Sequence, residues 1–456
     1  MKRERLGSRL GFILLSAGCA IGIGNVWKFP YMVGENGGAA FVLIYLFFLA
    51  ILGVPVLTME FALGRASQKS PVRIYQQLEK KGTKWHIHGY MSFIGNYLLM
   101  MFYTTVSAWM LQYFFKTARG DFEGADAAKV SRIFSDMNDT PLTMIIFVAI
   151  VVVIGFGVCS LGLEKGIEKI TKVMMLALIV LILVLGINSV FLDGGAEGLK
   201  FYLLPDFGAM KEVGIVKVLV AAMNQSFFTL SIGIGAMAIF GSYIGKDRAL
   251  MGEAVTVSIL DTFVAFTAGL IIFPACSSFG VAVNSGPDLI FKTLPPVFDS
   301  LPLGRVWGTL FFLFMTFAAL STVLAVFENL ISCTMDMTGW SRRKACVVNG
   351  VAMFVLSIPC VLGFNVLSDI EPLGAGTDIM DLEDFIVSNI LLPLGSFVFI
   401  MFCVNKRFGW GWDNFVEEAN QGKGLKVKKW MKGYMTFVLP IIVLTILIVG
   451  LIDYFS

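Results

Sequence analysis

Long runs of apolar residues, separated by shorter polar stretches, cover almost the whole chain. A membrane-spanning helix needs about 20 mostly apolar residues. By that measure the pattern predicts an all-α polytopic membrane protein with eleven transmembrane helices. The predicted spans are residues 10–33, 39–64, 90–115, 142–160, 172–192, 215–243, 252–282, 304–336, 345–362, 385–404 and 434–454.

The composition agrees with this pattern. Of the 456 residues, 57% are hydrophobic and 15% are charged, against about 25% charged in an ordinary soluble domain. The net charge of +3 is too small to indicate a nucleic-acid partner. The seven cysteines are dispersed and the two histidines stand in one polar loop, so neither set has the spacing of a metal site or a disulfide framework.

The basic residues predict an orientation in the cell (inner or cytoplasmic) membrane. If the N-terminus is cytoplasmic, 25 of the 35 Lys and Arg residues fall on the cytoplasmic side. The positive-inside rule therefore favours a cytoplasmic N-terminus, and eleven spans then place Ser456 on the extracellular side. The lipid bilayer is the expected surrounding, and no feature of the sequence indicates a particular oligomeric state.

The first span ends in charged Lys28 and lacks the small-residue cleavage site of a signal peptide.

The first and sixth predicted spans carry glycine pairs in mid-membrane, in GCAIGIGN (residues 18–25) and FFTLSIGIG (227–235). Glycine lets the backbone leave the helix, and freed backbone groups inside a membrane must line a cavity or bind a ligand. For Gly18-xxx-Gly22 alone, a close contact between two helices is an alternative interpretation. Two breaks at matching positions, five spans apart, indicate an inverted repeat with a binding site at the midplane.

Five segments resemble signature segments of the neurotransmitter:sodium symporter family, and more narrowly its bacterial eleven-span amino-acid transporters. They are AGCAIGIGNVWKFPYMVGENGGAAF (residues 17–41), NQSFFTLSIGIGAMAIFGSY (224–243), DTFVAFTAGLIIFP (261–274), FAALSTVLAVFEN (317–329) and DLEDFIVSNILLPLG (381–395). This resemblance extends over nearly the whole chain and implies symport of a small amino acid with sodium. It also implies two inverted five-helix repeats, spans one to five and six to ten, and a peripheral eleventh span. Residues 1–192 would form the first repeat, 193–404 the second with its preceding outer loop, and 405–456 a cytoplasmic loop and span eleven.

A zwitterionic amino acid needs a partner for each of its charges. The amides at Ile23 and Gly24 suit a carboxylate, because the exposed N–H groups of a helix end favour an anion. Carbonyls near Ala20, Phe228 and Thr229 suit the ammonium group. By resemblance, the pocket also takes Cys19, Gly22, Leu99, Tyr103, Ser231, Ile234, Thr322 and Val326.

Two aromatic residues of this pocket have expected roles. The resemblance makes Tyr103 the hydroxyl donor to the substrate carboxylate and Phe228 an aromatic lid, with ordinary helix packing as the alternative for both. Leu99, Ile234 and Val326 make the side-chain subsite apolar. The expected substrate is therefore a hydrophobic or aromatic amino acid.

The resemblance also implies two sodium sites built from oxygen ligands. The first would use the Ala20 carbonyl, the Asn25 amide oxygen, the carbonyl and hydroxyl of Thr229, Asp261 and the substrate carboxylate. Because ion and substrate complete each other's site, their binding would be reciprocally coupled. The second would use carbonyls of Gly18, Ile21 and Ala318 and hydroxyls of Ser321 and Thr322. For these two hydroxyls, hydrogen bonding within their own helix is the alternative.

Asp261 sets this chain apart from family members that depend on chloride. Those members carry Tyr, Gln, Asn and Ser around the anion. Here Tyr45 and Gln225 match, but Asp261 stands where Asn is usual and Ala265 where Ser is usual. We interpret Asp261 as a fixed charge that replaces chloride, so no chloride requirement is expected, and its protonation on the return step would add proton antiport. The alternative is a structural carboxylate hydrogen-bonded to Tyr45 and Gln225.

Two gates are expected to flank the site. The resemblance pairs Lys28 with Asp384 outside and Arg3 with Asp336 inside. Lys28 stands where the family usually has an arginine. Its ammonium group makes a single point contact with a carboxylate, whereas a planar guanidinium would make two parallel hydrogen bonds. The residues expected beneath span six are Ser242 and Tyr243. Two further acidic residues, Glu60 and Glu328, are expected to satisfy backbone freed by the break in span six.

Several other classes of membrane protein fit less well. No histidine falls in a span and no HExxH or GxSxG motif is present, so the chain is not expected to be an enzyme. It also carries no Walker loop and no repeated pore filter. The sequence therefore predicts a sodium-coupled symporter that imports a hydrophobic or aromatic L-amino acid by alternating access. A non-transporting amino-acid-binding membrane receptor of the same fold is the alternative.

Overall fold

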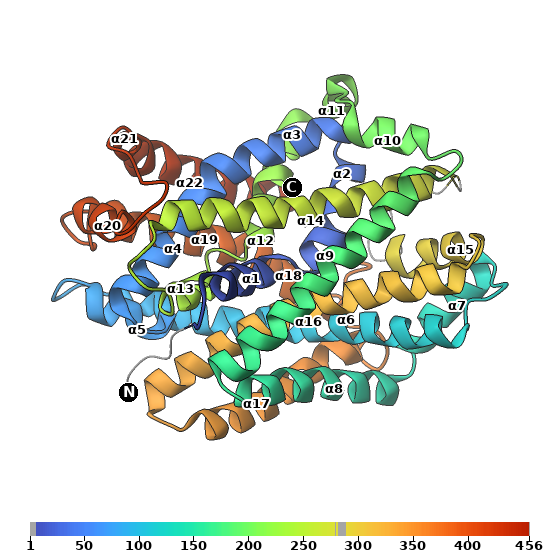
Figure 1. Ribbon diagram of the computed structural model, residues 1–456, viewed down its shortest axis with the longest axis horizontal. Coiled ribbons are helices and arrows are strands. Elements are labelled where there is room, and N and C mark those ends of the chain that lie inside the picture. Colours follow the sequence, from blue (N-terminus) through green and yellow to red (C-terminus); the bar gives the residue numbers. More distant parts are fainter. Residues whose placement is uncertain (1–5, 279, 281–288, 456) are drawn as a thin grey trace.

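The computed structural model describes residues 6–278, 280 and 289–455, which form helices joined by loops. Within these ranges, one isolated bridge joins Arg248 to Lys423 and no strand is present. Long helices run along the longest axis of the molecule (Figure 1). The elements of the predicted spans are α1 (Arg9–Ala20), η1 (Gly24–Lys28), α2 (Phe29–Glu35), α3 (Ala39–Phe48), η2 (Leu49–Gly53), α4 (Val54–Ser67), α6 (His86–Arg119), α8 (Pro141–Ser160), η3 (Leu163–Glu168), α9 (Lys169–Val190), α12 (Ile215–Thr229), α13 (Ala236–Gly241), α14 (Leu250–Ser278), α16 (Gly304–Thr338), α17 (Arg342–Gly363), α18 (Ile379–Phe385), η5 (Ile386–Leu391), α19 (Leu392–Val404), α21 (Met431–Gly433), η6 (Tyr434–Val438) and α22 (Leu439–Phe455).

Short helices occupy the loops between the spans. They are α5 (Pro71–Leu78), α7 (Ala127–Asn138), α10 (Ala196–Leu203), α11 (Phe207–Val213), η4 (Leu289–Thr293), α15 (Leu294–Asp299) and α20 (Trp412–Ala419). In Figure 1, α5 and α20 lie at one end of the bundle, and α7, α10 and α15 lie at the other. The first of these ends carries the basic loops, and we call it the basic end.

The number of membrane-length helices agrees with a polytopic membrane protein. Among the described residues, nine helices are long and apolar enough to cross a membrane, and the bent pair Arg9–Ala20 and Gly24–Glu35 makes a tenth. Helix α12 has 15 residues, which is too short to cross alone. The all-helical membrane architecture is therefore confirmed, and the count of eleven stays a prediction that treats α12 and α13 as one span.

Two spans begin six or more residues earlier than their apolar runs predict. Span five starts at Leu163 rather than residue 172, and span ten starts at Ile379 rather than residue 385. Charged residues occupy both added segments, 163–171 and 379–384. Hydropathy alone therefore places these helix starts too late.

The predicted breaks in spans one and six are present. Span one bends by 54° between α1 and η1. Span six leaves the helix between Thr229 and Ala236, where Gly233 and Gly235 adopt φ of +99° and +71°. Ser231 adopts φ of +50°, a conformation that a residue with a Cβ rarely takes and that concentrates at functional sites. The glycines therefore permit a backbone turn that a regular helix would exclude.

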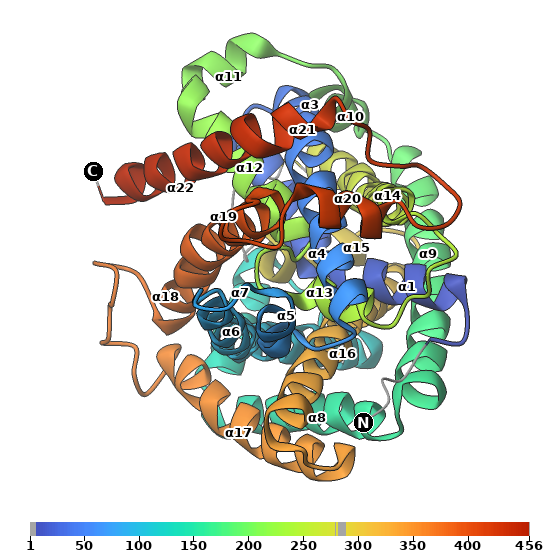
Figure 2. The same cartoon turned by 90° about the vertical axis from the view of Figure 1, so that its left-hand side faces the viewer.

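The two broken spans lie inside the bundle. Helix α1 packs against α13, α14 and α16, and α13 packs against α4. Seen from the basic end, α1 and α13 are surrounded by other helices, whereas α8, α17 and α22 lie at the edge (Figure 2). Span eleven is the least buried of the membrane-length helices in the described ranges, with 28% of its most apolar stretch buried, which agrees with its predicted peripheral place.

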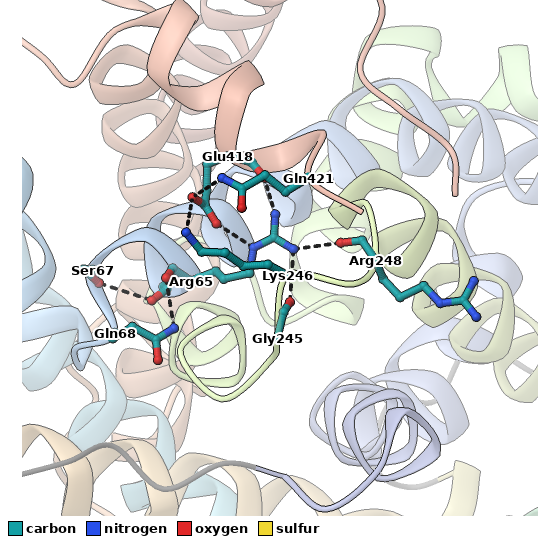
Figure 3. A network of polar contacts seen from close by, with 9 residues as sticks. Arg65, Ser67, Gln68, Gly245, Lys246, Arg248, Glu418 and Gln421 are labelled. Atoms are coloured by element: carbon teal, nitrogen blue, oxygen red, sulfur yellow. Dashed lines mark hydrogen bonds and ion pairs between the residues drawn. The ribbon is translucent and has the colours of Figure 1, made fainter. Parts of the chain in front are cut away.

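A buried arginine joins three segments at the basic end. The Arg65 Nε atom lies 2.6 Å from Glu418 Oε1 on α20, and its Nη1 atom donates to the carbonyls of Arg248 and Gly245 at 2.7 and 3.3 Å. Figure 3 shows these groups around the Arg65 guanidinium. The 405–433 segment is thereby anchored to the loop that follows α13.

Candidate functional site

The break in span one faces α6 and α16. The Ile23 amide donates to Tyr103 Oη at 3.0 Å, and the hydroxyl of Thr322 reaches the Cys19 carbonyl at 3.4 Å. A Cβ on Gly22 would lie 2.2 Å from Tyr103 Oη and 2.5 Å from Thr322 Oγ1. Only glycine therefore lets these two hydroxyl groups approach the broken backbone.

A small cavity of about 20 Å³ lies where the two breaks meet. Most of the residues expected in the substrate pocket line it, while Ile23 lines the wider space outside it. Val326 is buried but outside the lining. Leu392 lines the cavity although sequence reasoning did not select it, because its apolar run carries no sign of which helix face turns inward. The lining residues are Cys19, Ala20, Gly22, Gly24, Leu99, Tyr103, Phe228, Ser231, Ile234, Thr322 and Leu392.

Side chains from neighbouring helices satisfy the unwound part of span six. The Ser231 hydroxyl donates to a carbonyl of span one at 3.1 Å. The Gly233 amide donates to Glu60 Oε1 at 2.6 Å, and the Ile234 carbonyl accepts from Asn96 at 2.8 Å. Glu60 therefore contacts the freed backbone that the sequence assigned to it.

A carboxylate from span seven joins both breaks beside this cavity. Asp261 is fully buried, and its Oδ1 and Oδ2 atoms accept from Asn25 Nδ2 at 2.7 Å and Thr229 Oγ1 at 2.9 Å. The Asn25 amide oxygen in turn accepts from the Gly22 amide at 3.0 Å. Buried carboxylates need a cation or a proton, and within the described residues no basic side chain forms an ion pair with Asp261. The carboxylate and hydroxyl oxygens of this set suit a hard monovalent cation, whereas Asn25 presents its amide nitrogen to them and its predicted ligand oxygen to Gly22.

A second group of oxygen atoms joins span one to span eight. Ser321 Oγ lies 3.2 Å from the Ile21 carbonyl and 2.9 Å from the Ala318 carbonyl. Thr322 Oγ1 lies 3.3 Å from the Gly18 carbonyl and 3.4 Å from that of Ile21. The Ser321 hydroxyl thus has an acceptor both in its own helix and in span one, whereas all the carbonyl acceptors within reach of the Thr322 hydroxyl lie in span one. All five predicted ligands of the second sodium site lie together.

The residues expected around a chloride substitute are buried near the first break. Gln225 donates to the Gly24 carbonyl at 3.2 Å, and Ala265 is fully buried. Tyr45 Oη and Gln225 Oε1 have no hydrogen-bond partner among the described residues. The hydrogen bonds of the Asp261 carboxylate go to span one and span six instead, so the alternative in which Tyr45 and Gln225 hold it is not what the structure contains.

The outer gate residues meet above the cavity. Lys28 Nζ lies 3.1 Å from Asp384 Oδ2, donates to Ser388 at 3.1 Å and lies 4.0 Å from the centre of the Phe228 ring. A wider space of about 250 Å³ lies outside this layer and shares Gly24, Tyr103 and Phe228 with the cavity lining. Ser388 was not selected from the sequence, although its place one turn after Asp384 is the signal that would have found it.

The inner gate is described in part. Arg3 lies outside the described residues, as does Ser456. Asp336 accepts from the Ser70 amide at 2.8 Å, so it contacts the loop after span two. Ser242 donates to a carbonyl of its own helix at 2.6 Å.

Tyr243 is part of a charged cluster under span six. Its hydroxyl donates to Glu328 Oε1 at 2.6 Å, and Glu328 forms an ion pair with Arg342 at 2.6 Å. Glu328 therefore binds side chains, whereas the sequence had suggested that it satisfies backbone. The cluster connects α13, α16 and the start of α17.

Taken together, two broken helices, a buried cavity between them and two oxygen clusters define a membrane transporter rather than an enzyme. The comparisons with known proteins agree. The chain belongs to the sodium:neurotransmitter symporter family, whose model matches residues 3–128 and 121–456. It is therefore a multi-pass membrane protein of a family of sodium-dependent transporters.

Relatives and a solved structure match over most of the chain. The sodium-dependent transporter YhdH of Bacillus subtilis (strain 168) is 35% identical over 88% of this chain and 87% of its own length. The sodium- and chloride-dependent taurine transporter of Bos taurus is 26% identical over 99% of this chain and 79% of its own. The crystal structure of MhsT in complex with L-phenylalanine superposes with a TM-score of 0.88, at 37% identity over 98% of this chain and 99% of that one.

Proposed function

We propose that the protein is a symporter that carries a hydrophobic or aromatic L-amino acid into the cell together with sodium, by alternating access. The observation that carries the proposal is the contact of Asn25, Thr229 and Asp261 beside the cavity, because it joins both broken helices to one carboxylate. The phenylalanine bound to MhsT supports an apolar amino acid as substrate. Leu99, Ile234 and Leu392 give the cavity an apolar wall that suits such a side chain.

In this proposal, the substrate carboxylate meets the backbone amides of the first break and the hydroxyl of Tyr103. The carbonyls of both breaks receive the ammonium group. Sodium site one would be held by Ala20, Asn25, Thr229 and Asp261, and site two by the ligands shared between α1 and α16. A bound sodium neutralises the local carboxylates and fixes the broken segments, which favours the closed cavity.

The proposal includes independence from chloride. Asp261 already supplies a buried negative charge at the place where an anion would otherwise be needed. When sodium leaves toward the cell interior, this carboxylate needs another positive partner. A proton taken up for the empty return step would meet that need, and the cycle would then include proton antiport.

Uptake into proteoliposomes tests the proposal. We expect labelled leucine, phenylalanine, tyrosine or tryptophan to accumulate only with an inward sodium gradient, and to the same extent when gluconate replaces chloride. Sodium-dependent binding without any accumulation would support the receptor alternative. A failure of every apolar amino acid to compete would reject the proposed substrate class, and a steep rise of uptake with chloride would reject the role of Asp261.

The proposed orientation has the N-terminus in the cytoplasm, which is supported by the gathering of the basic loops at one end of the bundle. Cysteine labelling from either side tests it. A cysteine introduced at Lys428 is expected to react with an impermeant maleimide only after the cells are opened.

A further inference from the structure

An apolar groove runs along the edge of the bundle between α8 and α17, and shares no lining residue with the substrate cavity. The two helices pack against each other, and both lie at the periphery in Figure 2. The groove has a volume of about 570 Å³. Its lining residues are Ala149, Val152, Val153, Phe156, Gly157, Ser160, Arg343, Cys346, Val347, Gly350, Val351 and Phe354.

Small residues form the floor of the groove and valines form its walls. A Cβ on Gly157 would have no neighbour within 4 Å, and one on Gly350 would lie 3.4 Å from the Phe156 ring. Val153, Val347 and Val351 are 61 to 69% exposed. Such a surface, narrow and apolar along its length, suits a hydrocarbon chain.

One end of the groove is polar and positively charged. Arg342 reaches the Cys159 carbonyl at 3.3 Å, which brings the start of α17 next to the end of α8, where Ser160 lies. Arg343 lines the groove and makes no hydrogen bond or ion pair with any described residue. It also stands in the first turn of α17, which contains no acidic residue and whose exposed amides favour an anion.

We propose that this groove binds one anionic phospholipid, with an acyl chain between α8 and α17 and its phosphate on Arg343. The groove ends at the basic end of the bundle, and the leaflet on the cytoplasmic side is the one rich in anionic lipid. No acidic side chain lines the groove to repel the headgroup. The bound lipid holds the start of α17, where Arg342 pairs with Glu328 under the broken span six.

Photo-crosslinking of the intact protein in nanodiscs tests this site. The probes are phosphatidylglycerol and phosphatidylcholine that carry a diazirine in one acyl chain, each added in trace amount to a phosphatidylcholine bilayer. We expect phosphatidylglycerol to label peptides covering residues 149–157 and 346–354 about fivefold more than phosphatidylcholine does, as one added contact between a basic side chain and an anionic headgroup would give.

Three variants separate the contribution of the headgroup contact to lipid binding from that of the acyl-chain contact. Arg343→Gln is expected to remove the preference for phosphatidylglycerol, and Gly350→Leu to fill the groove and reduce labelling by both lipids. Lys344→Gln is the matched control, because the Lys344 ammonium lies 4.1 Å from the Trp340 ring rather than in the groove, and its labelling is expected to stay unchanged. Sodium-dependent amino-acid binding by each variant shows that it is folded.

Three results would overturn the proposal. The first is equal labelling of the groove by both lipids in the wild type, and the second is labelling confined to other helices. The third is crosslinking of two chains through a cysteine placed at Val347, which would assign the groove to a second copy of the protein. Each can be read without measuring transport.

Discussion

At the scale of single residues, the site is built from hydroxyl and carboxyl groups that reach across to other helices. The hydroxyl of Thr322 on α16 has three carbonyls of span one within reach as acceptors, at 3.3 to 3.4 Å. Asp261 bonds span one and span six at once. Removal of one such group is therefore expected to weaken both ion binding and the contact between helices.

Thr322→Ala is expected to weaken sodium binding about tenfold, because a bond to a charged group contributes about 1.5 kcal/mol. Substrate affinity should fall with it through reciprocal coupling. The matched control is Thr316→Ala on the same helix, where the hydroxyl bonds only to its own helix, at 2.7 Å. Scintillation proximity binding at graded sodium concentrations measures both. Equal effects of the two substitutions would remove Thr322 from the second sodium site.

Asp261→Asn is expected to lower uptake about a hundredfold or more, because it leaves a buried cation without its counter-charge. Ala265 has no hydroxyl to offer an added anion, so chloride alone should restore little. Adding Ala265→Ser should return transport only when chloride is present. Uptake against chloride concentration compares the three proteins, and a double mutant that is equally active in gluconate would contradict the assignment.

At the scale of secondary-structure elements, each break depends on a close approach that only glycine permits. Gly24 in η1 lies against Phe228, where a Cβ would be 2.7 Å from the ring. In the unwound part of span six, a Cβ on Gly233 would lie 2.1 Å from the Leu392 carbonyl. The breaks are therefore held by neighbouring helices, and their shape belongs to the packed bundle.

Gly22→Ala is expected to lower the stability of the protein by about 1 to 3 kcal/mol, the usual effect of overpacking. Tyr103→Phe, added to Gly22→Ala, removes the Tyr103 hydroxyl oxygen that lies nearest to the new Cβ, and should restore part of the lost stability. Gly433→Ala is the control, since its Cβ would have no neighbour within 4 Å. Thermal unfolding in detergent measures all three. No difference between Gly22→Ala and the control would show that the backbone at the break moves aside without cost.

At the scale of the whole molecule, loops far apart in sequence join the spans at the basic end. The 405–433 segment pairs with the loop after span six, where the Lys423 amide donates to the Asp247 carbonyl and its carbonyl accepts from the Ala249 amide, at 2.9 and 3.0 Å. Gly422 permits this approach, since a Cβ there would lie 2.2 Å from the backbone of Asp247. The buried Arg65 of span two stabilises the same contact, because its guanidinium binds both the Arg248 carbonyl and the Glu418 carboxylate.

Arg65→Gln is expected to destabilise the protein by about 3 to 5 kcal/mol, because it leaves the buried Glu418 carboxylate with only the distant, exposed Lys246 as a cationic partner. Lys246→Gln removes an exposed ion pair in which the Lys246 ammonium lies 3.7 Å from the same Glu418 carboxylate. This substitution should lower the stability of the protein by at most about 1 kcal/mol. Thermal unfolding compares the stability of the two variants. Hydrogen exchange over residues 412–424 shows whether the loss of stability is located at α20 and the loop after it. Unchanged exchange there in Arg65→Gln would show that α20 is held by other contacts.

Much of the fold follows from the sequence, because the demands of a membrane are local. An apolar run of sufficient length predicts a span wherever it falls, and paired glycines in mid-membrane predict a break. Seven of the eleven residues that line the cavity lie in the motifs at residues 18–25 and 227–235. The starts of spans five and ten were predicted too late, because both helices begin with segments rich in charged residues, and these lower the local hydropathy although the helix continues through them.

Contacts between helices were decided by the tertiary structure. Leu392 lines the cavity, Asp261 takes Asn25 and Thr229 as partners, and Glu328 pairs with Arg342. Each of these depends on how a helix is rotated and how far it is shifted along its neighbour. The sequence by itself determined which segments cross the membrane and where two of them break, since these follow from the chemistry of short stretches. Only the packed bundle decided which side chains meet there, because rotation and shift are set by the fit of all the helices at once.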